Sequence, residues 1–213
     1  MPLESHSTST WLDASVIAVI ALGLFHGLNP GQGWLFATFT AIYKRSIRYI
    51  PLTIAVVLAG HIASIAPIVA IYLIIQRYFD LANIPVAISL IVVGIYRFAR
   101  YAKHYRVSLR ISYLEIFLWS VLIGLSHGSG LSLLPFLGSH EPHNPYHYPL
   151  FLVTIHFLVT GITMLTMATI TTYILNLNAL RRIWINFDSL WAIILLIIGV
   201  ALLINYFITH GEF

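Results

Sequence analysis

Long apolar runs separated by short polar or charged joints dominate the chain. A helix that crosses a bilayer needs about 20 predominantly apolar residues, and six runs approach or exceed that length. They occupy 12–43, 49–75, 82–100, 112–138, 149–176 and 187–209. This pattern predicts an all-α, polytopic membrane protein with six transmembrane helices in the lipid bilayer of the cell (plasma) membrane.

The composition agrees with this class and excludes several others. Hydrophobic residues make up 59% of the 213 residues and charged residues 8%, against about 25% charged in a typical soluble domain. Cysteine is absent, which excludes disulfides, thiolate metal ligands and cysteine nucleophiles. Because no phosphate-binding glycine loop or catalytic carboxylate pair is recognisable, we expect no enzyme, unless the chain is a subunit of a membrane redox enzyme.

Basic residues alternate between the joints. All but one of the 11 Lys and Arg residues follow the first, third or fifth run, and the exception is Arg77. The positive-inside rule places these three joints in the cytoplasm and both termini outside. The basic segment 97–110 joins the two halves there, so we expect it to contact anionic lipid and expect no nucleic-acid partner.

The first run is too long for one helix and contains a break. It extends without a charge well beyond the length of one span, and Asn29, Pro30 and Gly31 lie in its middle, where a continuous helix tolerates them poorly. Asn at a cap and Pro at the first helical position indicate a new start. We expect a helix over 12–28 and a second piece from Pro30 to about residue 43. A water-exposed turn between two elements is the alternative.

The two halves of the chain share a short motif. Gly-Leu-Phe-His-Gly at 23–27 returns as Gly-Leu-Ser-His-Gly at 124–128. Three spans per half is an odd number, so the halves would cross the membrane in opposite directions. The chain is therefore predicted to be one membrane domain of two inverted three-helix repeats, 1–107 and 108–213, a plan that many transporters share.

Four histidines lie inside apolar runs. They are His26, His61, His127 and His156. An imidazole in hydrocarbon must find polar partners, and ionisable groups there mark functional sites. Neutral imidazole suits nickel, cobalt, copper, zinc and haem iron. We expect His26 and His127 to form the central pair of a midplane metal site, with His61 and His156 as further ligands or supporting partners.

Two further groups of residues are candidates for the same chemistry. Polar residues and a proline near the two motifs form a candidate substrate path: Asn29, Pro30, Gln32, Ser126 and Ser129. A predicted outer loop is rich in potential ligands: His140, Glu141, His143 and His147. Such tracts commonly bind metals, so this loop would collect ions at the mouth of the path. A polar interfacial loop is the alternative.

The missing carboxylates keep two other functions open. No Asp or Glu lies deep in a run, so imidazoles alone would leave the charge of a dication uncompensated. A helix start at Pro30 would also direct a positive dipole end toward the level of His26. Both features favour an exporter of a small organic or anionic solute. Four histidines on four helices would equally suit haem or copper in a subunit of a membrane redox complex.

The stretch His26-Gly27-Leu28-Asn29-Pro30-Gly31-Gln32, within six spans in two halves, resembles the lysine-exporter superfamily. The nearest branches are the nickel/cobalt permeases and the urease-accessory-type membrane proteins. The resemblance implies a secondary transporter (permease) for a divalent transition-metal ion, nickel or cobalt, with His26 on the path. Asn29 and Gln32 stand near the place where the nickel/cobalt signature has an acidic residue and a second histidine. A homo-oligomer and a complex with partner subunits are both compatible with this plan.

Overall fold

The computed structural model describes residues 5–75, 83–99, 112–137, 147–173 and 187–210, and these are helical with short breaks and contain no strand. The first half has α1 (Ser5–Leu28), η1 (Pro30–Gln32), α2 (Trp34–Tyr43), α3 (Tyr49–Ile75) and α4 (Asn83–Ala99). The second has α5 (Tyr113–His127), α6 (Ser129–Leu133), η3 (Leu134–Phe136), α7 (His147–Tyr173) and α9 (Phe187–His210). The all-α prediction is confirmed for this part of the chain.

Several helices are long and apolar enough to cross a membrane. Within the described residues these are Tyr49–Ile74 in α3, His147–Tyr173 in α7 and Ser189–Thr209 in α9, with 26, 27 and 21 residues. The bent pair of α5 with α6 and η3 makes a fourth when counted as one span. The remaining apolar segments are shorter, with 10–17 residues, and are Ala14–Leu28 in α1, Trp34–Tyr43 and Ile84–Ala99. The structure thus supports a membrane protein with three to four spans by length and composition, while six spans and outside termini stay predictions.

The predicted break in the first span is present. α1 ends before Asn29, whose side-chain oxygen accepts a hydrogen bond of 2.9 Å from the backbone N–H of Gly31. Gly33 adopts a φ of 131°, a conformation that glycine accepts most readily. The predicted helical start, with Asn29 as the cap and Pro30 at the first position, is present, but it opens a single 3₁₀ turn, and the α-helix of the second piece begins only at Trp34.

A second break divides the run that the sequence predicted as one span over 112–138. α5 ends at His127, Gly128 takes the left-handed conformation with a φ of 65°, and α6 begins at Ser129. The two pieces meet at a bend of 56°. Each half of the chain therefore breaks just after its Gly-Leu-X-His-Gly motif.

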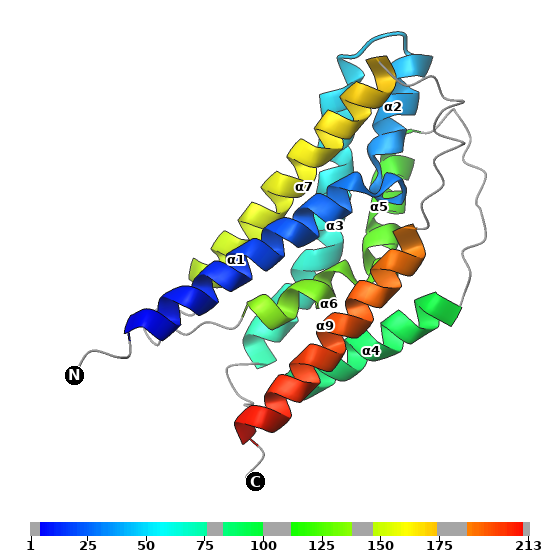
Figure 1. Cartoon of the computed structure of the whole chain (residues 1–213). Coiled ribbons are helices and arrows are strands. Elements are labelled where there is room, and N and C mark those ends of the chain that lie inside the picture. The colour runs from blue at the N-terminus through cyan, green and yellow to red at the C-terminus, as the bar shows by residue number, and fades with distance from the viewer. Residues whose placement is uncertain (1–4, 76–82, 100–111, 138–146, 174–186, 211–213) are drawn as a thin grey trace.

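The long helices pack in three pairs, which are α1 with α7, α3 with α5, and α4 with α9 (Figure 1). Small side chains permit the first two close approaches. A hydroxyl crosses each of them, since Thr160 on α7 donates to the carbonyl of Gly23 on α1 at 3.3 Å and Ser120 on α5 donates to that of Val57 on α3 at 2.6 Å. In the predicted repeat, α1, α3 and α4 of the first half correspond to α5, α7 and α9 of the second. Exchanging corresponding helices turns the pair α1 with α7 into α5 with α3, and it leaves the pair α4 with α9 unchanged.

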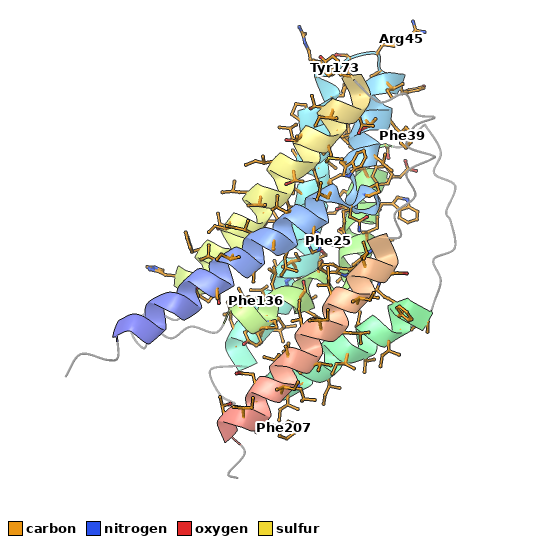
Figure 2. The ribbon with its side chains drawn as sticks, in the orientation of Figure 1. Phe25, Phe39, Arg45, Phe136, Tyr173 and Phe207 are labelled. Carbon is orange, nitrogen blue, oxygen red and sulfur yellow. The ribbon has the colours of Figure 1, made fainter. Side chains whose placement is uncertain are left out.

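The directions of corresponding helices in the two predicted halves are opposite, as an inverted repeat requires. Figure 1 shows that α3 and α7, the equivalent spans of the two predicted halves, run in opposite directions, and so do α4 and α9. Figure 2 shows Arg45 and Tyr173 at one end of the bundle and Phe207 at the other.

Two apolar clusters flank the centre of the bundle. One includes Val19, Leu22, Ile65, Leu152 and Trp191, and the other includes Trp34, Val57 and Met164. On both α3 and α7, a histidine lies in sequence between members of the two clusters. Outward positions carry exposed apolar side chains such as Ile17, Leu122, Ile197 and Ile208, which is the surface that lipid tails require.

Candidate metal centre

Three helices bring one histidine each to a common point in the interior. His26 comes from the last turn of α1, His61 from the middle of α3 and His156 from α7. Each offers one ring nitrogen, and these three nitrogens all lie within 4.8 Å of one another. The ring centroids are 5.3 Å apart for His26 and His61, 5.1 Å for His26 and His156, and 6.0 Å for His61 and His156.

The three imidazoles are enclosed by protein. His26 and His156 have no exposed surface and His61 has 2%. Among the residues that the structure describes, the Nε2 atoms of His26 and His61 and both ring nitrogens of His156 have no hydrogen-bond partner. A buried polar atom without a partner costs about 1–3 kcal/mol, so this arrangement weakens the fold unless the nitrogens have another function.

His26 is oriented as a ligand by its own helix. Its Nδ1 lies 3.0 Å from the carbonyl oxygen of Leu22 one turn earlier. A carbonyl can only accept, so Nδ1 carries the proton and Nε2 keeps its lone pair. This is the usual way in which proteins fix the tautomer of a metal-ligating histidine.

The donor set suits a transition-metal ion with one open position. Imidazole binds nickel, cobalt, copper and zinc, and metal–nitrogen distances of about 2.0–2.1 Å place two nitrogens of a tetrahedral site about 3.3 Å apart. Small side-chain rotations would close the group to that spacing. Three protein ligands leave a fourth position open, which is typical of sites that exchange what they bind, whereas structural zinc sites use four.

The helix dipoles near His26 are less unfavourable to a bound cation than the sequence predicted. His26 lies in the last turn of α1, at the negative end of the helix dipole. The predicted positive end at Pro30 is absent, because α2 starts only at Trp34. The group of three contains no carboxylate, so the charge of an ion would be compensated by dipoles and not by an anion.

His127 differs from its predicted role. The sequence paired it with His26 at the centre, but the described group consists of His26, His61 and His156. The Nε2 of His127 lies 3.0 Å from Nη2 of Arg97, and its Nδ1 lies 2.8 Å from the carbonyl oxygen of Ile123. A guanidinium only donates, so Arg97 occupies the lone pair that a metal would need.

Aromatic side chains form the walls of the histidine group. Trp191 on α9 meets His26 edge to face, with ring centroids 4.5 Å apart. Phe157 meets His61 and His156 at 5.6 and 5.7 Å, and Phe25 stacks on Trp191 at 5.5 Å. The sequence placed Arg97 in the basic joint between the two predicted halves and gave no local signal that distinguishes Trp191 from the other tryptophans.

The predicted path residues lie at the two breaks. Asn29 and Gln32 are buried with 3% exposed surface each, and Pro30 is partly buried between them. Ser129 is buried and donates to the carbonyl of Gly124 at 3.0 Å, whereas Ser126 is exposed. Of the predicted outer loop, His140, Glu141 and His143 lie outside the described residues, and His147 is exposed at the start of α7.

Comparison with known proteins gives no assignment. No protein-family model, no curated protein and no solved structure matches this chain. The function is therefore argued from the fold and the histidine group.

Proposed function

We propose that this chain is a membrane transporter (permease) for a divalent transition-metal ion, which binds transiently to His26, His61 and His156. The observation that carries the proposal is the convergence of three buried imidazoles, each with a ring nitrogen within 4.8 Å of the others. Four ring nitrogens of this group have no hydrogen-bond partner among the described residues, and an ion would supply one. The open fourth position suits release of the ion.

The arrangement of the helices supports transport over a static role. An inverted-repeat transporter has broken helices at its binding site and equivalent helix pairs in its two halves. In this chain two helices break beside a histidine, and the helix pairs stay the same when the two predicted halves are exchanged. Rocking of the halves would then open the histidine group to one side of the membrane at a time. Nickel and cobalt are the first ions to test, because imidazole suits both and the resemblance to the nickel/cobalt permeases implies them.

The geometry favours a bare ion over haem. A bis-histidine haem needs two imidazoles on opposite faces of a flat porphyrin slot. Here three rings crowd one point, inclined to one another by 55°, 88° and 34°, and Trp191 closes the side next to His26.

The test is metal content and flux in one preparation. The untagged protein is purified without chelators, and its nickel, cobalt, copper and zinc per chain are measured beside its visible spectrum. Flux of Ni²⁺ and Co²⁺ is then followed in vesicles. We expect binding and flux in the wild type and neither in His26→Ala. Thr166→Ala is the matched control, because Thr166 is exposed on α7 and lies ten residues, or about 15 Å, from His156 along that helix.

Three results would overturn the proposal. The first is flux that survives in His26→Ala. The second is a Soret band, which would indicate a haem subunit. The third is a chain that neither binds nor moves any of these ions, which would return attention to export of an organic or anionic solute.

A further inference from the structure

The helices that carry His26 and His127 orient the two imidazole rings in the same way. Each lies in the last turn of its helix, since α1 ends at Leu28, two residues after His26, and α5 ends at His127 itself. Each directs Nδ1 at the carbonyl oxygen four residues earlier, at 3.0 Å to Leu22 and 2.8 Å to Ile123. In both side chains Nε2 therefore keeps the lone pair. A packing role alone gives no reason for two identical tautomers at equivalent positions.

The two histidines differ in what faces Nε2. That of His26 points into the group with His61 and His156, whereas that of His127 accepts from Nη2 of Arg97 at 3.0 Å. Arg97 is itself held in place, because its Nη1 donates to the carbonyl of Ser126 at 2.9 Å. Arg97 thus occupies the Nε2 lone pair of His127, the atom that corresponds to the one His26 directs into the group.

The helix that carries His127 already lies beside His61. A Cβ added at Gly124 would meet the side chain of Ser64 and would lie 3.4 Å from Nδ1 of His61. His127 is three residues further along α5 and so shares that helix face. In the first half, Gly23 lies against the backbone of His156 on α7 in the corresponding way, and His26 follows it by three residues.

Trp191 connects the two positions. Its ring packs on His26 with centroids 4.5 Å apart, and its indole N–H donates to the carbonyl of His127 at 2.6 Å. A displacement at the α5 break is therefore transmitted to the side chain that confines His26.

From these contacts we propose that His26 and His127 are alternating ligands of one transported ion. In the state described here His26 completes the site with His61 and His156. When the halves exchange their conformations, α5 moves along α3, Arg97 releases His127, and His127 replaces His26 beside the same two histidines. The inference rests on the proposed function, and its tests separate binding from movement of the ion.

The first test compares equilibrium binding of Co²⁺ alone with Co²⁺ flux in vesicles. In His127→Ala we expect the dissociation constant to stay within about threefold of the wild type, because the His26 state is intact, and flux to fall at least about tenfold. His26→Ala is expected to lose both. His127→Gln repeats the measurement in case the alanine variant does not fold, with elution volume and helical circular dichroism as checks.

The second test asks whether uncovered His127 can replace His26. Adding Arg97→Gln to His26→Ala removes the group that covers His127, and we expect Co²⁺ binding to return to within about tenfold of the wild type. Adding His127→Ala to this double variant should abolish binding again. Thr166→Ala in the same background is the control and should leave the regained binding unchanged.

The outcomes distinguish the two proposals. Wild-type flux in His127→Ala, no recovery in the double variant, or recovery that persists without His127 would each overturn the alternation while leaving a His26 site intact. A wild-type chain that neither binds nor transports a transition metal would overturn the proposed function and the alternation with it.

Discussion

Trp191 closes the histidine group from the side of α9, with its ring 4.5 Å from that of His26. The same indole donates its N–H to the backbone of α5 at the point where that helix breaks. One side chain thus encloses a candidate metal ligand and also donates a hydrogen bond to the carbonyl of His127, the last residue of α5. This double contact makes Trp191 the first position at which the stability of the break can be tested.

Replacing Trp191 by Phe keeps an aromatic ring and removes the N–H. We expect the free energy of unfolding to fall by about 1–3 kcal/mol, because the carbonyl of His127 loses a buried hydrogen bond. The measurement is the thermal unfolding midpoint in detergent. Leu190→Val, next to Trp191 on α9, is the control, since Leu190 is 42% exposed. Equal shifts in both variants would contradict a contribution from the indole hydrogen bond.

His156→Leu is expected to separate stability from binding. Neither ring nitrogen of His156 has a hydrogen-bond partner among the described residues, so leucine removes two unsatisfied polar atoms without opening a large cavity. The metal-free protein should gain about 1 kcal/mol of stability, while Co²⁺ affinity falls at least about 100-fold. Loss of stability together with unchanged affinity would show that His156 is a packing residue.

Metal affinity is expected to fall as the pH is lowered. The three imidazoles would bind a metal only in the neutral form, so protons and the ion would compete for the same nitrogens. Titrating Ni²⁺ or Co²⁺ binding from about pH 8 down to about pH 3 tests this, with helical circular dichroism as a check that the chain stays folded. An affinity that does not change over this whole range would argue against histidine ligands. Thr166→Ala, an exposed position on α7, should leave the pH profile unaltered.

Gly124→Ala is expected to disturb the contact between α5 and α3. The added methyl group would collide with the side chain of Ser64, and overpacking of this kind costs about 1–3 kcal/mol. Ser64→Gly in the same chain makes room for the methyl group and should restore most of the loss. The thermal midpoints of the two single variants and the double variant form the cycle. Additive effects would show that the two residues are not in contact.

The amino-acid pattern predicted the helical class and one break for reasons that are local. Hydrocarbon leaves a backbone almost no alternative to helix, so apolar runs of sufficient length indicate helices directly. Asn29 and Pro30 carry their own break signal, although they cannot reveal that the α-helix resumes only at Trp34. The break at Gly128 was missed because its one signal is the repetition of the first motif, and no proline marks it.

The candidate site, like the fold, could be predicted from the sequence only in part. Four histidines within apolar runs predicted a candidate chemistry, because a buried imidazole must have a partner or a function. Which of the four converge depends on how the helices pair. The pairing of α1 with α7 and α3 with α5 brings His26 to His61 and His156, and it leaves His127 to Arg97 on α4. Contacts between residues so far apart in sequence have no local signal.

What the sequence determined by itself was therefore the class of the protein and the kind of ligand available, since hydropathy, helix breaks and residue chemistry are properties of short segments. Tertiary structure alone decided which histidines converge, the aromatic enclosure by Trp191 and the contact of His127 with Arg97. Those depend on side-chain packing between helices, where approaches of a few ångströms decide whether a nitrogen faces an arginine or two other imidazoles.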